Sequence, residues 1–108
     1  MIKVDTTTLS NVINQCFAYS SDGRLSADEQ TAMLADGKRL RGLLLNLLSA
    51  QFDDSTQAVI DANKQLTTVN TALANSATAL ANAAQTLNVV STLVGNLDKL
   101  LNVASGFI

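Results

Sequence analysis

The sequence predicts an all-helical protein, and three observations support that fold class. Proline, the residue that disrupts helices most, does not occur among the 108 residues, and glycine occurs five times. Aromatic residues make up 4 %, which is too few for a β-sandwich of this size. The C-terminal half places an apolar residue at every seventh position without a gap. We expect a single helical domain over residues 1–108, a helical bundle of three helices with a long heptad-patterned C-terminal helix.

The first helix is expected over residues 6–20. Asp5 and the three threonines after it offer side-chain oxygens suited to capping a helix start. The apolar residues that follow have helical spacing and form one stripe: Leu9, Val12, Ile13, Cys16 and Phe17. Cys16 is the only cysteine, so an intrachain disulfide is excluded. We interpret it as a small buried hydrophobe, because the chain has no histidine that could activate a thiol.

The second helix is expected over residues 26–51. Residues 20–23 are a turn signal, and Ser26 with Glu29 matches a capping box, in which each side chain accepts from the other residue's backbone amide. Gly37 is a weak point, where a kink or short break would fit the pattern. Apolar residues then recur every seven positions: Met33, Leu40 and Leu47.

The turn before this helix has a second interpretation. Residues 22–29 resemble positions five to twelve of an EF-hand calcium loop, with Asp22 and Glu29 as two of the ligands. The resemblance fails at the start of the loop, where Ala18 and Ser20 stand at the first and third positions. A turn followed by a capping box explains the same residues and is the preferred interpretation.

The third helix is expected over residues 54–104, after a turn over residues 52–56. Two series with heptad spacing form its a and d positions. The a series is Val59, Leu66, Leu73, Leu80, Leu87, Val94 and Leu101. The d series is Ala62, Val69, Ser76, Ala83, Val90, Leu97 and Ala104. Residues 65–97 contain no charge, so pairing along this helix must rely on shape and apolar contact.

The second half of this long helix has no cover within a bundle of three helices. We define the interaction stripe as the apolar residues left over: Leu80, Leu87, Val90, Val94, Leu97 and Leu101. A fold-back of the helix on itself would need a break, and only the stretches at Asn75 and Gly95 offer weak ones. We therefore favour cover by another molecule, either a homo-oligomer such as a coiled coil or a helical protein partner.

Composition argues against catalysis and against nucleic-acid binding. The chain has no histidine, a single glutamate and no glycine-rich phosphate loop. We expect no enzyme activity, no catalytic residue, no cofactor and no metal site. Seven lysines and arginines at a net charge of −2 do not form the basic face that nucleic acid requires.

The expected function is that of a non-catalytic interaction or structural protein, which self-associates or binds a partner through the interaction stripe. The alternative is a membrane- or lipid-surface-active amphipathic helical protein, similar to pore-forming toxins or granule-coating proteins. It is less favoured because the stripe has no tryptophan and no basic flank. A calcium-responsive module is a third hypothesis. The start of the chain does not resemble a signal peptide and no stretch is long and apolar enough to span a membrane, so we expect a soluble, cytoplasmic protein.

Overall fold

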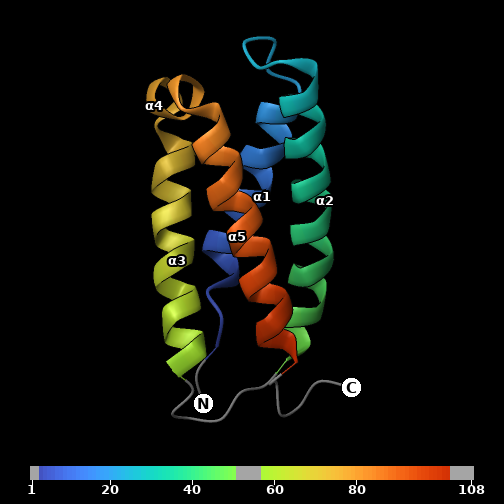
Figure 1. Ribbon diagram of the computed structural model, residues 1–108. Helices are drawn as coiled ribbons and strands as arrows, with labels where there is room; N and C mark the ends of the chain where they lie inside the picture. The colour runs from blue at the N-terminus through green and yellow to red at the C-terminus, as the bar shows by residue number, and fades with distance from the viewer. Residues whose placement is uncertain (1–2, 51–56, 103–108) are drawn as a thin grey trace.

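A computed structural model describes residues 3–50 and 57–102, and within them the chain forms five helices and no strand. Four long helices stand side by side: α1 (Thr6–Ser20), α2 (Ala27–Ser49), α3 (Gln57–Ala74) and α5 (Ala83–Leu101). The short helix α4 (Ser76–Ala81) joins α3 to α5 at one end of the bundle (Figure 1). The predicted turn over residues 52–56 and both ends of the predicted third helix lie outside the described residues.

The four long helices are arranged in a ring in which α1 neighbours α2 and α3, and α5 also neighbours α2 and α3. Within the described residues α2 and α3 share no contact and lie on a diagonal, although they follow each other in the chain. The helices α1 and α3 run in one direction, and α2 and α5 run in the other (Figure 1). Each long helix therefore packs against two neighbours and covers part of the apolar face of each.

The first two helices begin where their capping residues predict. At the start of α1 the Asp5 carboxylate accepts from the Thr8 backbone amide at 3.0 Å. At the start of α2 both halves of the capping box are formed: Ser26 Oγ accepts from the Glu29 amide, and Glu29 Oε1 accepts from the Ser26 amide at 2.9 Å. The predicted capping box is confirmed, and it satisfies backbone donors that a helix start leaves without intrahelical partners.

The weak point at Gly37 does not break α2. The helix continues from Ala27 to Ser49, and Gly37 is buried against α1. A Cβ atom at this position would lie 3.0 Å from Cε1 of Phe17 and 3.3 Å from Cβ of Cys16. The glycine therefore permits close approach of the two helices, which a pattern along one helix does not reveal.

The prediction of one continuous helix over residues 54–104 is wrong, and so is the bundle of three helices that followed from it. The chain leaves helical geometry at Asn75 and Asn82, and α5 folds back along α3. Asn75 Oδ1 accepts from the Thr78 amide at 3.3 Å and so starts a new helix. The fold-back that the sequence offered as the weaker alternative is the one that the chain adopts.

Polar side chains satisfy the backbone carbonyls that this break releases. The hydroxyl of Tyr19, from α1, donates to the carbonyl of Leu73 at 2.6 Å. Thr86 Oγ1 lies 3.1 Å from the carbonyl of Ala79, to which it donates across the joint between α4 and α5. Such bonds lower the cost of ending a helix without glycine or proline.

The buried face changes register between the two halves of the heptad pattern. In α3 the a and d positions are buried: Val59, Ala62, Leu66, Val69 and Leu73. In α5 the buried set is instead Thr86, Val90, Leu93, Leu97 and Leu100, which are d and g positions. The break thus rotates α5 relative to a straight continuation of α3, and the wide apolar stripe provides a buried face in either case.

Candidate functional site

The structure places the predicted interaction stripe inside the bundle. Val90 and Leu97 are fully buried. The other four members are partly buried and pack against the core: Leu80, Leu87, Val94 and Leu101. The expectation that this stripe lies uncovered is wrong, because the fold-back places α5 against both α2 and α3. In the folded chain the stripe forms part of the core.

Within residues 3–50 and 57–102, the exposed large apolar side chains lie mainly on α2. Leu45 and Leu48 are 65 % and 63 % exposed, which is unusual for two neighbouring leucines on one helix. Leu34 on α2 and Ile60 on α3 are less exposed, at 38 % and 36 %. The apolar surface available to another molecule is therefore concentrated near the end of α2.

A shallow groove between α1 and α2 extends this surface. It has a volume of about 350 Å³, and its lining combines apolar and polar residues: Ser10, Ile13, Asn14, Phe17, Arg41 and Leu44. Leu44 precedes Leu45 and lies one turn before Leu48 on α2. We name the groove together with the exposed side chains of Lys38, Leu45 and Leu48 the α2 face.

The α2 face is positively charged. Its two basic residues, Lys38 and Arg41, are exposed, and Arg39 is exposed on another side of the same helix. The neighbouring helix α1 contains no charged residue, so no charge on that helix opposes them. Arg39 comes within 4.0 Å of Asp98 on α5, but both side chains are more than half exposed and such pairs contribute little.

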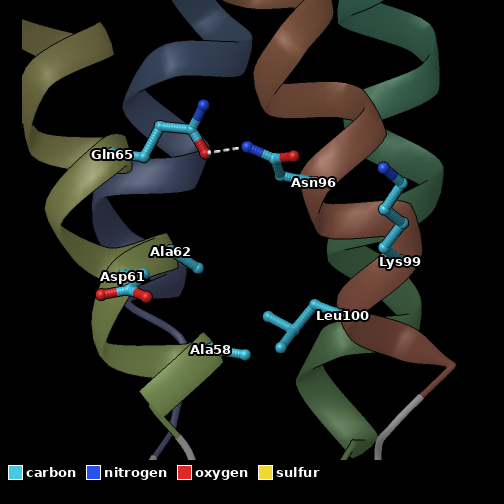
Figure 2. A pocket seen from close by; sticks show the side chains of 7 residues that line it. All are labelled: Ala58, Asp61, Ala62, Gln65, Asn96, Lys99 and Leu100. Atoms are coloured by element: carbon cyan, nitrogen blue, oxygen red, sulfur yellow. Dashed lines mark hydrogen bonds between the residues drawn. The ribbon is translucent and has the colours of Figure 1, made fainter.

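A second cavity lies between α3 and α5 (Figure 2). This cleft has a volume of about 530 Å³ and an apolar floor of Ala58, Ala62 and Leu100. Asn96 Nδ2 donates to Gln65 Oε1 at 3.0 Å and bridges one end of the cleft, as Figure 2 shows. The remaining lining residues are one acid and one base, Asp61 and Lys99. The lining lacks a pair of groups that could act as nucleophile and base.

The other candidate groups have structural explanations. Cys16 is fully buried, and burial raises the pKa of its thiol to about 12, with a smaller contribution from the charge of Asp36. It therefore stays protonated at neutral pH, in agreement with its interpretation as a buried hydrophobe.

The turn that resembles a calcium loop is held by its own side chains. Asp22 accepts from Arg24 Nε at 3.0 Å and from Arg24 Nη2 at 2.7 Å, and these bonds lower the pKa of Asp22 to about 2. Glu29 is engaged in the capping box. Among the described residues no group of three or more His, Cys, Asp or Glu side chains is placed to hold a metal ion. The turn and capping box account for these residues.

Comparisons with protein-family models, with curated proteins and with solved structures find no match to this chain. No helix within residues 3–50 and 57–102 is long and apolar enough to cross a membrane. Within the part of the chain that the structure describes, the α2 face combines the two most exposed large apolar side chains with two exposed basic ones.

Sequence reasoning missed the α2 face, although a signal for it was present. Five residues of α2 are spaced alternately by four and three positions, which places them on one face of a helix: Leu34, Lys38, Arg41, Leu45 and Leu48. This face lies beside the Met33–Leu40–Leu47 series that enters the core. The leucines of this face are not needed for the core of the bundle, and they lie on either side of the two basic residues.

Proposed function

We propose that this chain is a non-catalytic helical interaction protein that binds an amphipathic, acidic α-helix of a partner protein on the α2 face. The observation that carries the proposal is the pair of highly exposed leucines, Leu45 and Leu48, beside a cluster of exposed basic residues. Exposed apolar side chains surrounded by polar ones are typical of protein-binding surfaces.

The shape of the α2 face supports a helix as the ligand. The lining of the groove extends over about two turns of α1, from Ser10 to Phe17, and includes the apolar residues Ile13, Phe17 and Leu44. An amphipathic helix binds such a groove by inserting apolar residues at every third or fourth position. Leu45 and Leu48 continue the apolar contact along α2 beyond the groove.

The charge of the α2 face supports an acidic ligand. Arg41 lines the groove and Lys38 lies one turn before it on the same face of α2, whereas the α1 wall contributes only uncharged residues such as Ser10 and Asn14. Glutamates flanking the apolar positions of a partner helix would meet these basic groups. Such complementarity speeds encounter and selects the partner more than it adds affinity.

An anionic lipid surface is the competing ligand, because basic residues and leucines on one helix face also bind membranes. The concave groove favours a protein helix, since a membrane surface cannot insert into it. Self-association through the interaction stripe would require α5 to leave the bundle, because Val90 and Leu97 are fully buried.

The proposal is tested with a designed peptide of about 18 residues, or five helical turns, that has a leucine face flanked by glutamates. Binding is measured by fluorescence anisotropy against the intact chain. The double variant Leu45→Glu with Leu48→Glu should bind more than about tenfold more weakly, because it removes the central apolar contacts and adds like charge. The matched control is Ile60→Glu on α3, which introduces one glutamate at an exposed apolar residue off the α2 face.

Two further measurements separate the alternatives. A peptide with lysines in place of the glutamates should bind weakly, and added salt should weaken binding of the acidic peptide. Equal binding of both peptides, or equal loss in the Ile60→Glu control, would contradict the proposal. If the intact chain sediments with phosphatidylserine vesicles, the double variant does not, and the intact chain binds neither peptide, the ligand of the α2 face is lipid.

A further inference from the structure

The heptad pattern continues through residues 75–82, which join α3 to α5. The folded bundle does not require a continuous helix at this joint. The a and d positions run from Val59 to Leu101 in one register, and Leu80 and Ala83 keep that register through the joint between α3 and α5. In the folded chain α5 buries its d and g positions instead. Because the register passes through the joint without interruption, residues 57–101 can form one helix in which α5 still buries its d and g positions and the a and d positions of the joint become free to pair.

No residue of the joint enforces the fold-back. Residues 75–82 contain neither glycine nor proline, and within the described residues no backbone φ is positive. The non-helical residues are Asn75, with φ −91° and ψ 85°, and Asn82, with φ −122° and ψ 48°. Rotation about ψ at Asn75, and about both φ and ψ at Asn82, returns both residues to helical geometry. Alanines dominate the residues between and after them, and alanine has the highest intrinsic helix propensity.

The interface between α3 and α5, which would open if residues 57–101 formed one helix, is incompletely packed. The cleft of about 530 Å³ separates one end of α5 from α3, with the small side chains of Ala58 and Ala62 on its floor. Across it the described side chains form the single hydrogen bond between Gln65 and Asn96. Release of α5 from α3 at this end therefore breaks one hydrogen bond among the described side chains, and the remaining contact to be replaced is the apolar packing of Leu97 and Leu100.

We infer that two copies of this chain exchange α5: the joint straightens, and the α5 of each copy packs against α2 and α3 of the other. The second copy is the occupant that fits the vacated surface, because it supplies the same side chains in the same contacts, including the fully buried Val90, Leu93 and Leu97. A single open chain would expose that surface to water, so opening is coupled to dimerisation. The inference is independent of the α2 face.

In the exchanged dimer, the continuous helix over residues 57–101 allows a contact between the two joints that the folded chain lacks. Forty-five residues of helix span about 68 Å at 1.5 Å per residue, whereas the folded bundle is 42 Å long. The joint therefore projects beyond the bundle, where the joints of two copies can pair through Leu80, Ala83 and Leu87. Pairing there gives the heptad positions of the joint a role.

Specific side-chain contacts favour the folded form and provide the means to shift the balance. Asn75 caps α4, and Asn82 Nδ2 donates to the carbonyl of Thr78 at 3.2 Å. The double variant Asn75→Ala with Asn82→Ala removes both contacts and installs good helix formers. Loss of one cap shifts a helix equilibrium by about fivefold, and a dimer straightens two joints, so the association constant should rise by more than about tenfold.

The matched control is Ser76→Pro, which should lock the folded form. Ser76 is the first residue of α4 and is exposed, and proline is well accepted at that position of a helix. In a continuous helix the same proline would remove a hydrogen bond and clash with the carbonyl of residue 72. Ser76→Pro is expected to stay at the mass of one chain at concentrations where Asn75→Ala with Asn82→Ala has the mass of two, measured by light scattering on a sizing column.

A cross-link identifies the exchange. Gln65→Cys and Asn96→Cys are introduced into both variants and joined by a short bifunctional maleimide; the buried Cys16 is left unchanged. The isolated dimer should give covalent pairs of chains on a denaturing gel, and the Ser76→Pro monomer should give single chains. A dimer that separates into single cross-linked chains would overturn the exchange, as would equal masses for the two variants while circular dichroism shows both folded.

Discussion

Gly37 contacts the ring of Phe17 where α2 packs on α1. A methyl group added at this position would lie 3.0 Å from the ring and 3.3 Å from Cβ of Cys16. Both distances are shorter than ordinary van der Waals contact between carbon atoms. The residue is therefore selected by packing, and the conformational freedom of glycine has no part in it, because its φ is not positive.

The substitution Gly37→Ala should destabilise the fold by about 1 kcal/mol. Overpacking costs about 1–3 kcal/mol, and the better helix propensity of alanine returns about 1 kcal/mol. The control is Gly42→Ala in the same helix, where no atom lies within 4 Å of the added methyl group, and it should stabilise by about 0.5–1 kcal/mol. Urea unfolding measures both; an equal gain in the two variants would mean that Phe17 moves aside freely.

Local residue signals were readable from the sequence, whereas contacts between helices were not. The cap at Asp5, the capping box at Ser26 and the burial of Cys16 were predicted because each depends on nearby residues. Gly37 was interpreted as a possible break because its partner Phe17 lies on another helix. Its role becomes visible only when α1 and α2 are placed together.

The ends of the helices depend on individual caps more than on propensity. Asp28 and Glu29 lie in the first turn of α2, where their negative charges interact favourably with the helix dipole and stabilise the helix. Ser26 supplies the oxygen that receives the Glu29 amide at 3.2 Å. Without it this exposed helix start has to rely on water.

The substitution Ser26→Ala should lower the free energy of unfolding by about 1 kcal/mol, the usual cost of removing a serine cap. Ser26→Asp serves as the control, since aspartate is an equally good cap and should leave stability nearly unchanged. Thermal unfolding followed by circular dichroism measures both. The same loss in the two variants would show that the hydroxyl of Ser26 has another role than accepting this bond.

The break between α3 and α5 could not be predicted from local residues as these caps could, for a physical reason. Asn75 and Asn82 are ordinary residues in a polar helix face, and the heptad register passes through both. One of the bonds that stabilise the break comes from Tyr19, 54 positions away in the chain, to the carbonyl of Leu73. Helix periodicity contains no information on such a contact.

At the scale of the whole molecule, polar contacts fix how the four long helices are aligned. On one side Asp5 and Gln15 are tied to α3: the Asp5 amide donates to Asn63 Oδ1 at 2.7 Å, and Gln15 Nε2 donates to Asn70 Oδ1 at 2.6 Å. On the opposite side Ser91 Oγ of α5 donates to Asp36 Oδ2 of α2 at 3.1 Å. These contacts set the register of α1 on α3 and of α5 on α2, while apolar burial supplies most of the stability.

The Asp36 contact also makes the stability of the bundle depend on pH. Burial raises the pKa of Asp36 above its ordinary value, and the hydrogen bond from Ser91 offsets part of the rise. The folded chain therefore holds this proton more tightly than the unfolded chain, so ionisation of Asp36 costs stability. The cost is absent below the unfolded pKa of about 3.9, grows as pH rises towards the folded pKa, and is constant above it.

The substitution Asp36→Asn should accordingly stabilise the protein at pH 7 and leave it unchanged at about pH 3, below the unfolded pKa. The gain should be less than about 1 kcal/mol, because the carboxyl is partly exposed and solvent screens its charge. Asparagine keeps an acceptor for Ser91, so the alignment of α5 on α2 is preserved. Urea unfolding at the two pH values measures the difference.

Asp98→Asn is the control, since it removes the same charge from an exposed position 4.0 Å from Arg39. It should give no gain at pH 7 and at most a small loss, because it removes a favourable pair instead of a buried charge. A gain for Asp36→Asn that is as large at pH 3 as at pH 7 would show that packing, and not ionisation, is responsible. A gain in the free energy of unfolding at pH 7 alone would show that the charge of Asp36 lowers stability. The chain would then keep a destabilising charge at the contact between α2 and α5.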